Sequence, residues 1–505
     1  MSTDTGVRRF AYRQGPGKGL FGGAIEIDDS VPTTAVLPPT AARGSTGHPL
    51  PHGTTDRLRA APYPHGRAGA ATPGAAAGDD AGHVLLTAFG LQRREPSNRF
   101  NDHRVVASVR SKFPVHVFTV SGSGAGYLDL HRHALVDLDV PAADVPAPLG
   151  DLDVVLAARY TDLPTPYGQL RCALGDLETG INIRSLLVAA ELSGVRAQVS
   201  LDGADAAACA RMIRATGPGR WSAPVRVALS GLAAPAGGRT LPGGGPAAAA
   251  FEAPDTLLAA SSGHPSLDEA ERINTHRFAA RSPLAPPAPG IPPTTAGAAS
   301  AATRWDGVLW NRTAGRVPGR LSGFSGRPVQ LPEAAVDEFL AWAAVPAPSP
   351  ELAEIGRRVR LLVALQNVGD RPAGYYEAAP DGLRPVQENP GVMTALQAAF
   401  GYPISPGTDC GLRHAAMVWT YAVDVHALLA DLGPHAWSLL QLWCGWTAHG
   451  LEMAAAALGL YARPARSYDE FRIQRLAGLP RRTVPVFMTV CGRSRFAEPM
   501  LDLRT

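Results

Sequence analysis

The sequence predicts an α+β fold built from two related halves, each with helices around a central, mainly antiparallel sheet. Apolar residues surround most of the helical circumference over 433–460, as in a helix buried inside a domain. A weaker copy of this pattern occurs at 167–195, with Gly180 in the place of Gly445. Runs with strand periodicity accompany each copy. We therefore expect a pseudo-dimer within one chain, with these two helices at its interface.

The composition favours a soluble, cytoplasmic protein and excludes some classes of partner. The 505 residues include 47 basic and 44 acidic ones, so the net charge of +3 creates no field that attracts nucleic acid or an anionic membrane. No window approaches the ~18 consecutive apolar residues of a membrane-spanning helix. The five cysteines are scattered without metal-ligand spacing, which suits a reducing compartment and predicts no metal site.

Two stretches with few large apolar residues divide the chain, because such stretches cannot bury enough surface to offset the entropy of ordering. We expect an N-terminal segment at 1–30, a Pro/Gly/Ala-rich loop at 31–82, a first half at 83–232, a linker at 233–303 and a second half at 304–505.

Each half has its own predicted order of elements. In the first half we expect a helix at 84–91, a strand after Pro114, a hairpin at 126–138, a strand at 154–160, the first helix copy and a closing strand at 225–231. The linker holds one helical stretch at 266–278. In the second half we expect a helix at 331–343, a strand at 359–365, a strand from 374, helices at 390–401 and 413–432, the long helix at 433–460 with a tight loop after it, and a last strand at 483–492. Pro332 at a first turn and Gly459 at a helix end support two of these boundaries.

The order of these elements, with their local sequences, resembles the nitroreductase superfamily of flavin enzymes. Within it, the chain is most similar to the SagB/ThcOx-type thiazole/oxazole-forming peptide dehydrogenases. Residues 85–91 and 107–114 resemble that family's Leu-Leu-x-x-x-Gly and Pro-Ser-x-Gly-x-x-x-Pro segments, with Ala107 and Arg110 in place of the usual Pro and Gly. Residues 311–316, with 324–329, resemble the Arg-Arg-Ser-x-Arg-x-Phe segment that holds the flavin phosphate. We call 108–114 the serine segment and 311–316 the arginine segment.

The two halves lack different parts of the family pattern. The first half has no arginine segment, and 345–352 in the second half matches the serine segment poorly. In the family each flavin site is built across the dimer interface, so these complementary losses imply one FMN per chain. By resemblance, the cofactor-binding residues are Arg312, Thr313, Arg316, Arg493, Arg495, Ser108, Arg110, Tyr461, Ala462 and Arg463. Without the resemblance, arginine clusters in such an arginine-rich chain are often solvated surface.

Two residues are candidates for proton transfer. Azoline oxidation requires a base that removes a proton while hydride leaves for the flavin, and Tyr or Lys can fill this role. The family often has a Lys-Tyr pair where this chain has Pro166 and Tyr167, so Lys112 of the serine segment would supply the missing amine. The alternatives are that Tyr167 caps a helix and that Lys112 is a surface lysine.

The resemblance implies an FMN-dependent dehydrogenase that oxidises thiazoline or oxazoline rings in a peptide during biosynthesis of a modified peptide such as a thiopeptide. Its implied partners are the azoline-bearing peptide, a cyclodehydratase, and a leader peptide or carrier protein, with further dimerisation left open. Two alternatives remain. One is another nitroreductase-type flavin oxidoreductase that uses NAD(P)H, and the other is a flavin-free scaffold subunit of a peptide-modifying complex.

Overall fold

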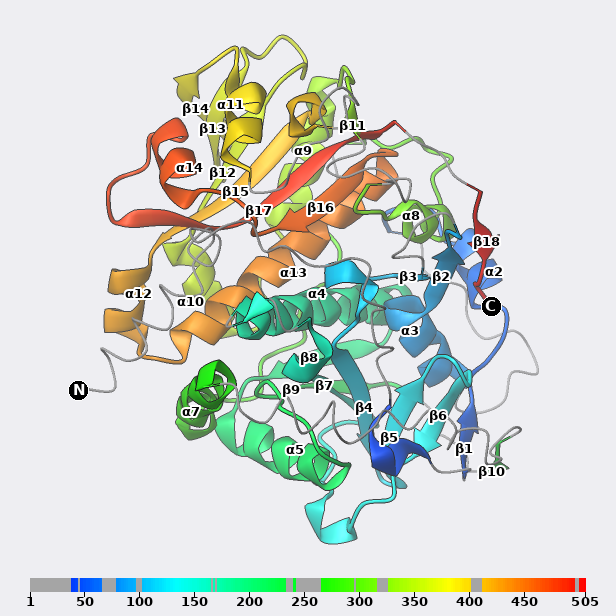
Figure 1. Ribbon diagram of the computed structural model, residues 1–505. Coiled ribbons are helices and arrows are strands. Elements are labelled where there is room, and N and C mark those ends of the chain that lie inside the picture. The colour runs from blue at the N-terminus through cyan, green and yellow to red at the C-terminus, as the bar shows by residue number, and fades with distance from the viewer. Residues whose placement is uncertain are drawn as a thin grey trace.

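Two antiparallel sheets, one from each half, lie on either side of a pair of long helices in the computed structural model (Figure 1). The structure describes residues 38–43, 46–65, 79–96, 102–164, 167–168, 170–232, 239–241, 265–294, 297–315, 326–400, 411–495 and 499–505. The predicted N-terminal segment at 1–30, Pro166 and Arg316 lie outside the described residues.

The first half is an eight-stranded sheet in the order β10-β1-β6-β5-β4-β7-β9-β8. Its strands are β1 (Thr46–Pro49), β4 (Val115–Ser121), β5 (Gly124–Asp129), β6 (Ala134–Asp137), β7 (Leu152–Ala158), β8 (Arg196–Ser200), β9 (Val225–Ser230) and β10 (Arg239–Thr240). Its helices are α2 (Thr54–Arg59), α3 (Asp79–Phe89), α4 (Leu170–Leu192), α5 (Gly203–Ala215) and α7 (Pro265–Ala279), with short 3₁₀ turns at Thr40–Arg43, Val109–Ser111, Ala142–Asp144 and Tyr160–Asp162. The predicted helix, hairpin, strands and linker helix are confirmed here.

The second half is a seven-stranded sheet in the order β11-β17-β15-β12-β13-β14, with β16 also paired to β17. Its strands are β11 (Gly326–Arg327), β12 (Arg360–Leu365), β13 (Gly374–Ala379), β14 (Gly382–Glu388), β15 (Met417–Asp424), β16 (Tyr461–Ala465) and β17 (Thr483–Ser494). Its helices are α8 (Trp305–Asn311), α9 (Glu333–Ala343), α10 (Pro350–Arg358), α11 (Val392–Ala399), α12 (Val425–Leu432), α13 (Ala436–Ala457) and α14 (Glu470–Leu476), with a 3₁₀ turn at Leu412–His414.

The central helices α4 and α13 are the two copies that the sequence pattern paired. They pack against each other where their glycines meet, because a Cβ on Gly180 would lie 2.0 Å from the Leu442 carbonyl oxygen and one on Gly445 would lie 1.9 Å from that of Leu177. Leu442 and Leu177 each lie three residues before the glycine of their own helix. The contact is therefore reciprocal, as a pseudo-twofold axis requires. The predicted helix interface is confirmed.

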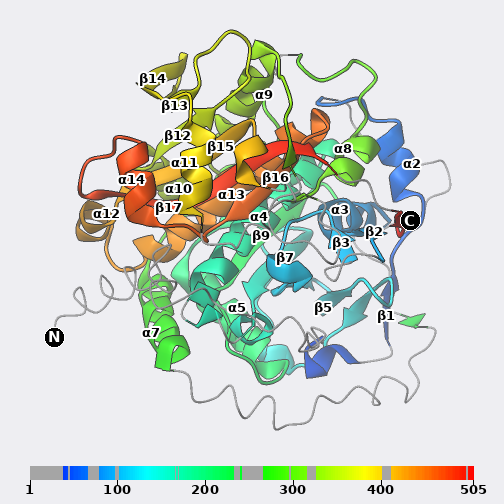
Figure 2. The same cartoon turned by 45° about the horizontal axis from the view of Figure 1, so that its top comes forward.

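The two halves are further joined by a shared core and an exchanged strand. One cluster of buried apolar residues includes members of both sheets and both central helices. β18 (Leu501–Asp502), from the end of the second half, pairs with β2 (Leu91–Arg94) of the first half, which in turn pairs with β3 (Asp102–Arg104). Figure 2 shows this end of the chain beside β2 and α2. The halves thus form one body.

Three predictions about local structure were wrong. The predicted helix at 413–432 is the strand β15 followed by α12, because a continuous apolar run rich in Val, Trp and Tyr cannot be assigned by periodicity alone. The tight loop expected after Gly459 is the strand β16, stabilised by pairing with β17. The predicted loop at 31–82 contains β1 and α2, and both Leu50, which follows β1, and Leu58 of α2 are buried.

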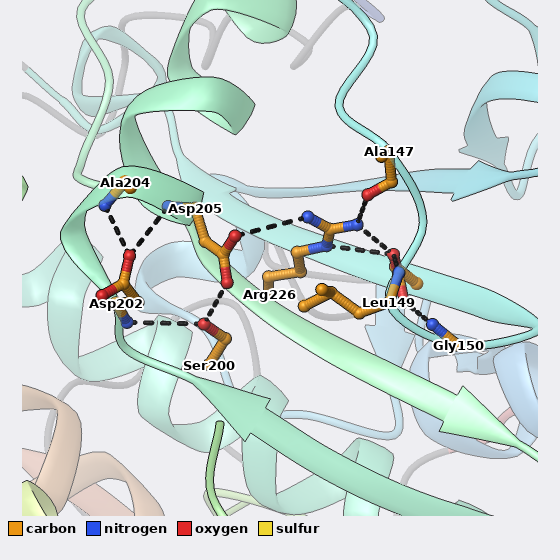
Figure 3. Close-up of polar contacts among 9 residues, drawn as sticks. Ala147, Leu149, Gly150, Ser200, Asp202, Ala204, Asp205 and Arg226 are labelled. Carbon is orange, nitrogen blue, oxygen red and sulfur yellow. Dashed lines mark hydrogen bonds and ion pairs between the residues drawn. The ribbon is translucent and has the colours of Figure 1, made fainter. Parts of the chain in front are cut away.

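A buried ion-pair network stabilises the first sheet at the start of β9 (Figure 3). The Arg226 guanidinium donates to the fully buried Asp153 carboxylate, with Nε at 3.0 Å, and to the Ala147 carbonyl oxygen. Asp153 also accepts from the backbone N–H groups of Leu149 and Gly150, at 2.8 and 3.0 Å. Because the two charges satisfy each other and the backbone, we interpret this network as structural.

Two features are absent from the described part of the chain. It contains no group of three or more His, Cys, Asp or Glu side chains placed to hold a metal ion. None of its helices combines the length and the apolar character needed to span a membrane.

Candidate active site

The arginine segment begins at the last residue of α8 and lies at the interface between the halves. Arg312 is buried, and its Nη2 donates to the carbonyl oxygen of Arg104 in the first half at 2.9 Å. The Arg312 carbonyl oxygen in turn accepts from both terminal nitrogens of Arg93, at 3.2 and 3.3 Å. Burial lowers the pKa of Arg312, while the nearby Glu452 and Glu95 carboxylates raise it. Hydrogen bonds with Arg104 and Arg93 of the first half therefore hold Arg312 in the interface.

The predicted ring-side residues lie directly beside the arginine segment. The Ala462 N–H donates to the Thr313 carbonyl oxygen at 3.0 Å, and the Arg463 Nε donates to the Ala314 carbonyl oxygen at 2.6 Å. Tyr461 is buried, and its hydroxyl has no hydrogen-bond partner among the described residues. The structure thus places 461–463 next to Thr313.

The other predicted phosphate ligands are at the end of β17. Arg493 lies opposite Arg327 of β11 in the antiparallel register, and Arg495 is exposed. Burial, followed by the charges of Arg413 and Arg495, lowers the pKa of His414. Like charges directly opposite each other in a sheet are destabilising, and an anion bound between them would remove that cost. The sequence pattern did not single out Arg413. The turn before β15 brings this residue close to the arginines at the end of β17.

The serine segment has an unusual backbone. Arg110, Ser111 and Phe113 have φ angles of 53°, 52° and 48°, in the left-handed region that side chains other than Gly rarely adopt. The Ser108 Oγ accepts from the Phe113 N–H at 2.7 Å, and the Val109 N–H donates to the Glu178 carboxylate of α4 at 2.8 Å. Arg110 thus keeps a glycine-like conformation at the position where the resembled family has Gly. Strain of this kind is typical of functional sites.

The two predicted catalytic residues both lie near Arg110. The Arg110 Nε donates to the Tyr167 hydroxyl oxygen at 3.1 Å, so Tyr167 faces the serine segment. Lys112 is buried rather than on the surface, and burial lowers its pKa, which the Asp162 carboxylate opposes and the Arg110 charge reinforces. A lysine with a lowered pKa is a better base near neutral pH.

A buried glutamate of α4, Glu178, connects the serine segment to the central helices, and a second buried glutamate, Glu452, lies on α13; sequence reasoning missed both. Burial raises the pKa of Glu178 to about 8, opposed by the Val109 amide and the Ser108 hydroxyl and reinforced by Glu452 of α13. Glu452 is bonded to His449, with Oε2 and Nδ1 2.9 Å apart, and burial lowers the pKa of His449. An acid buried near a second acid prefers its neutral form.

Several buried polar atoms around this interface lack a hydrogen-bond partner among the described residues. These atoms are Arg104 Nε, Arg312 Nε, His449 Nε2, Glu452 Oε1 and the Tyr461 hydroxyl. Buried polar atoms are nearly always satisfied in native proteins, so such a cluster suggests a polar ligand or ordered water. Two of these atoms belong to arginines, whose guanidinium groups fit an anionic, hydrogen-bonding cofactor such as FMN.

The corresponding region on the other side of the pseudo-twofold axis is filled by aromatic side chains. Tyr63 follows α2 as Arg312 follows α8, and its hydroxyl donates to Glu338 at 2.6 Å and accepts from Trp342 Nε1 at 2.6 Å. Its ring lies 5.3 Å from that of Trp305, centroid to centroid. Arg184, placed on α4 as His449 is on α13, lies 4.3 Å over the Trp446 ring. Protein side chains therefore fill this second region.

Comparison with known proteins agrees with this architecture. No family model and no curated protein matches the chain. A candidate nitroreductase of known structure from Anabaena variabilis superposes on 97% of this chain and 99% of its own, with a TM-score of 0.64 and 14% identity. This chain has a nitroreductase-like fold. The superposition extends through both halves, which confirms the predicted fold class.

Two other solved structures match over a smaller part of the chain. A candidate nitroreductase from Ralstonia eutropha covers 38% of this chain and 83% of its own, with a TM-score of 0.28 and 19% identity. The E. coli microcin synthetase McbBCD complex with truncated pro-MccB17 bound covers 36% and 71%, with a TM-score of 0.29 and 16% identity. Scores this low add nothing to the fold assignment.

Proposed function

We propose that this protein is an FMN-dependent dehydrogenase that oxidises thiazoline or oxazoline rings in a peptide to thiazoles or oxazoles. The observation that carries the proposal is the contact of the arginine segment with the first half across the interface. Arg312 reaches Arg104, just before the serine segment, while Ala462 is bonded to Thr313. The nitroreductase-like fold supports the wider class of flavin oxidoreductase, and the serine segment supports the narrower one.

The residues that would hold FMN come from both halves. Arg312, Thr313, Arg493 and Arg495 would bind the phosphate, with Arg327 opposite Arg493 as an additional cation. Ser108 and Arg110 from the first half, and Tyr461, Ala462 and Arg463 from the second, would flank the ring. Bound FMN supplies the acceptor for the hydride that leaves the azoline ring.

The protein's own residues must remove a proton from the α-carbon, which is next to the ring carbon that loses the hydride. Tyr167 is the candidate base, since a guanidinium that donates to its oxygen stabilises negative charge there. Lys112 is the second candidate, because burial favours its neutral form. Replacing Tyr167 with Phe should lower turnover about 100-fold while FMN stays bound, the usual scale for losing a general base. An unchanged rate would remove Tyr167 from the mechanism.

The filled second region supports a stoichiometry of one FMN per chain. The absorbance spectrum of the purified protein, with the flavin released and counted, tests this directly. Two flavins per chain would contradict the one-site proposal. A folded, colourless protein that takes up no added FMN would contradict the enzyme proposal altogether.

The reaction itself is tested with a synthetic peptide that carries one thiazoline. We expect each ring to lose two hydrogen atoms in a dioxygen-dependent reaction. Mass spectrometry of the peptide measures this loss. Rapid anaerobic bleaching of the flavin by NADPH, without any change in the peptide, would instead identify a reductase that uses a nicotinamide donor. The natural context that we propose is biosynthesis of a modified peptide, with a cyclodehydratase that supplies the azoline.

A flavin-free scaffold subunit is a second candidate function, favoured by one observation. Arg312 is 3% exposed and already donates to a protein carbonyl, so phosphate binding would require its guanidinium to turn or to use its remaining donors. Loading the protein with FMN separates the two functions, because a scaffold would bind none.

A further inference from the structure

A cavity of about 540 Å³ lies at the edge of the first half, and none of its lining residues belongs to the candidate active site. Its volume falls within the range of sites that enclose a small molecule. Parts of the chain that are far apart in sequence form its walls, including the end of β1, α3, β2, the β5–β6 hairpin and the tail after β18. In Figure 1 these elements gather on the right, where the chain ends.

Most of the wall is apolar. Six leucines line the cavity, namely Leu50, Leu86, Leu91, Leu130, Leu241 and Leu503. Leu503 belongs to the second half and is held in place by its N–H, which donates to the Gln92 carbonyl oxygen at 3.0 Å. The exchanged tail therefore completes the cavity.

One side of the cavity is polar and includes the Arg132 side chain. Arg132 and His133 come from the β5–β6 hairpin, and His133 stacks on His52 with ring centroids 4.9 Å apart. Burial, followed by the neighbouring His52, lowers the pKa of His133, whose Nε2 donates to the Pro51 carbonyl oxygen at 3.3 Å. His133 is therefore neutral near pH 7, and Arg132 supplies the charge. The nearby Asp129 carboxylate accepts from the backbone N–H groups of residues 131 and 132, at 3.0 and 3.1 Å.

We propose that this cavity binds a free small amphiphile that has an unbranched apolar chain and a carboxylate head group. The leucines bury the chain, and the Arg132 guanidinium pairs with the carboxylate, a match that favours two parallel charge-assisted hydrogen bonds. The proposal does not depend on flavin chemistry, because no cavity residue takes part in the candidate active site.

Isothermal titration of the full-length protein with decanoate, below its micellar concentration, tests the proposal. Arg132→Gln should weaken decanoate binding about 10-fold or more, the equivalent of one charge-assisted pair. Leu130→Trp should abolish binding by filling the cavity. The matched controls are Arg196→Gln and Leu149→Trp, at exposed positions outside the cavity, and both should bind as the unchanged protein does.

Three results would overturn the proposal. The unchanged protein could bind no decanoate, both cavity variants could bind it normally, or decyltrimethylammonium could bind as tightly as decanoate. Circular dichroism of each variant establishes that it is folded, and Arg132→Gln tests the head-group contact even when Leu130→Trp does not fold.

Discussion

The two halves use the arginines of their closing strands in different ways. In the first half, Arg226 of β9 is buried among Asp153, Ala147 and Asp205. Its charge is neutralised inside the sheet by the two carboxylates (Figure 3). In the second half, Arg493 of β17 lies opposite another arginine, Arg327, at the end of the strand. The same kind of strand therefore stabilises the fold in one half and, in our proposal, binds a ligand in the other.

The segments that follow the first helix of each half differ in a similar way. Residues 60–65 after α2 contain no arginine, and Tyr63 fills the space with aromatic contacts. After α8, Arg312 enters the interface and leaves one nitrogen without a partner among the described residues. A duplicated fold can thus retain a candidate site on one side of its axis while the other side becomes core.

The sharpest test of this contrast replaces the buried arginine of the first half. Arg226→Ala leaves the Asp153 carboxylate buried without its cation, so the free energy of unfolding should fall by about 3–5 kcal/mol. Urea denaturation measures this loss, with exposed Arg196→Ala as the control. If Arg226→Ala has the stability of the control, the network in Figure 3 is not structural.

The helix crossing should be equally intolerant of change from either half. Gly445→Ala places a methyl group against the Leu177 carbonyl oxygen and should lower the free energy of unfolding by about 3 kcal/mol, with Gly180→Ala losing a similar amount. Thermal unfolding measures both. Gly307→Ala in α8 is the control, because nothing lies within 4 Å of its added Cβ. Unequal losses at Gly180 and Gly445 would break the proposed symmetry.

Arg493→Ala tests the role of the second closing strand. We expect FMN affinity to fall by about 1.5–3 kcal/mol, the contribution of a charge-assisted contact, with little change in stability. Fluorescence titration with FMN gives the affinity, and Arg384→Ala on the exposed strand β14 serves as the control. Unchanged FMN binding in Arg493→Ala and in the Arg312→Ala, Arg493→Ala double variant would reject both residues as phosphate ligands.

A smaller, pH-dependent effect should come from Glu178. Its pKa is about 8 in the folded protein against an ordinary 4.5, so the folded state holds a proton that the unfolded chain releases. The free energy of unfolding should therefore fall as pH rises from about 5 to 8. Glu178→Gln keeps the acceptor for Val109 but does not ionise, so it should be more stable than the unchanged protein at pH 8.5, by an amount that shrinks toward pH 5.

The control for Glu178→Gln is Glu388→Gln at an exposed position. It should show the same pH dependence of stability as the unchanged protein. Urea denaturation at pH 5 and pH 8.5 gives both values. A difference between Glu178→Gln and the unchanged protein that does not shrink toward pH 5 would show that Glu178 is ionised in the folded state.

The sequence by itself determined the duplicated organisation, the helix interface and most of the strands. These features leave local signals, such as helical periodicity, short β-branched runs and a glycine at the same place in each copy. By resemblance, it also pointed to the arginine segment, which contacts the first half at the interface. Gly180 and Gly445 were recognisable because a close helix crossing requires a residue without a side chain.

Only the tertiary structure decided which of these residues touch and what they become. β15 was mistaken for a helix because strand pairing, and not periodicity, decides the state of a wholly apolar run. Glu178 and Glu452 are ordinary helix residues in sequence, and their burial beside each other depends on how α4 and α13 pack. Contacts such as Arg312 with Arg104 join residues far apart in the chain, so no local pattern encodes them.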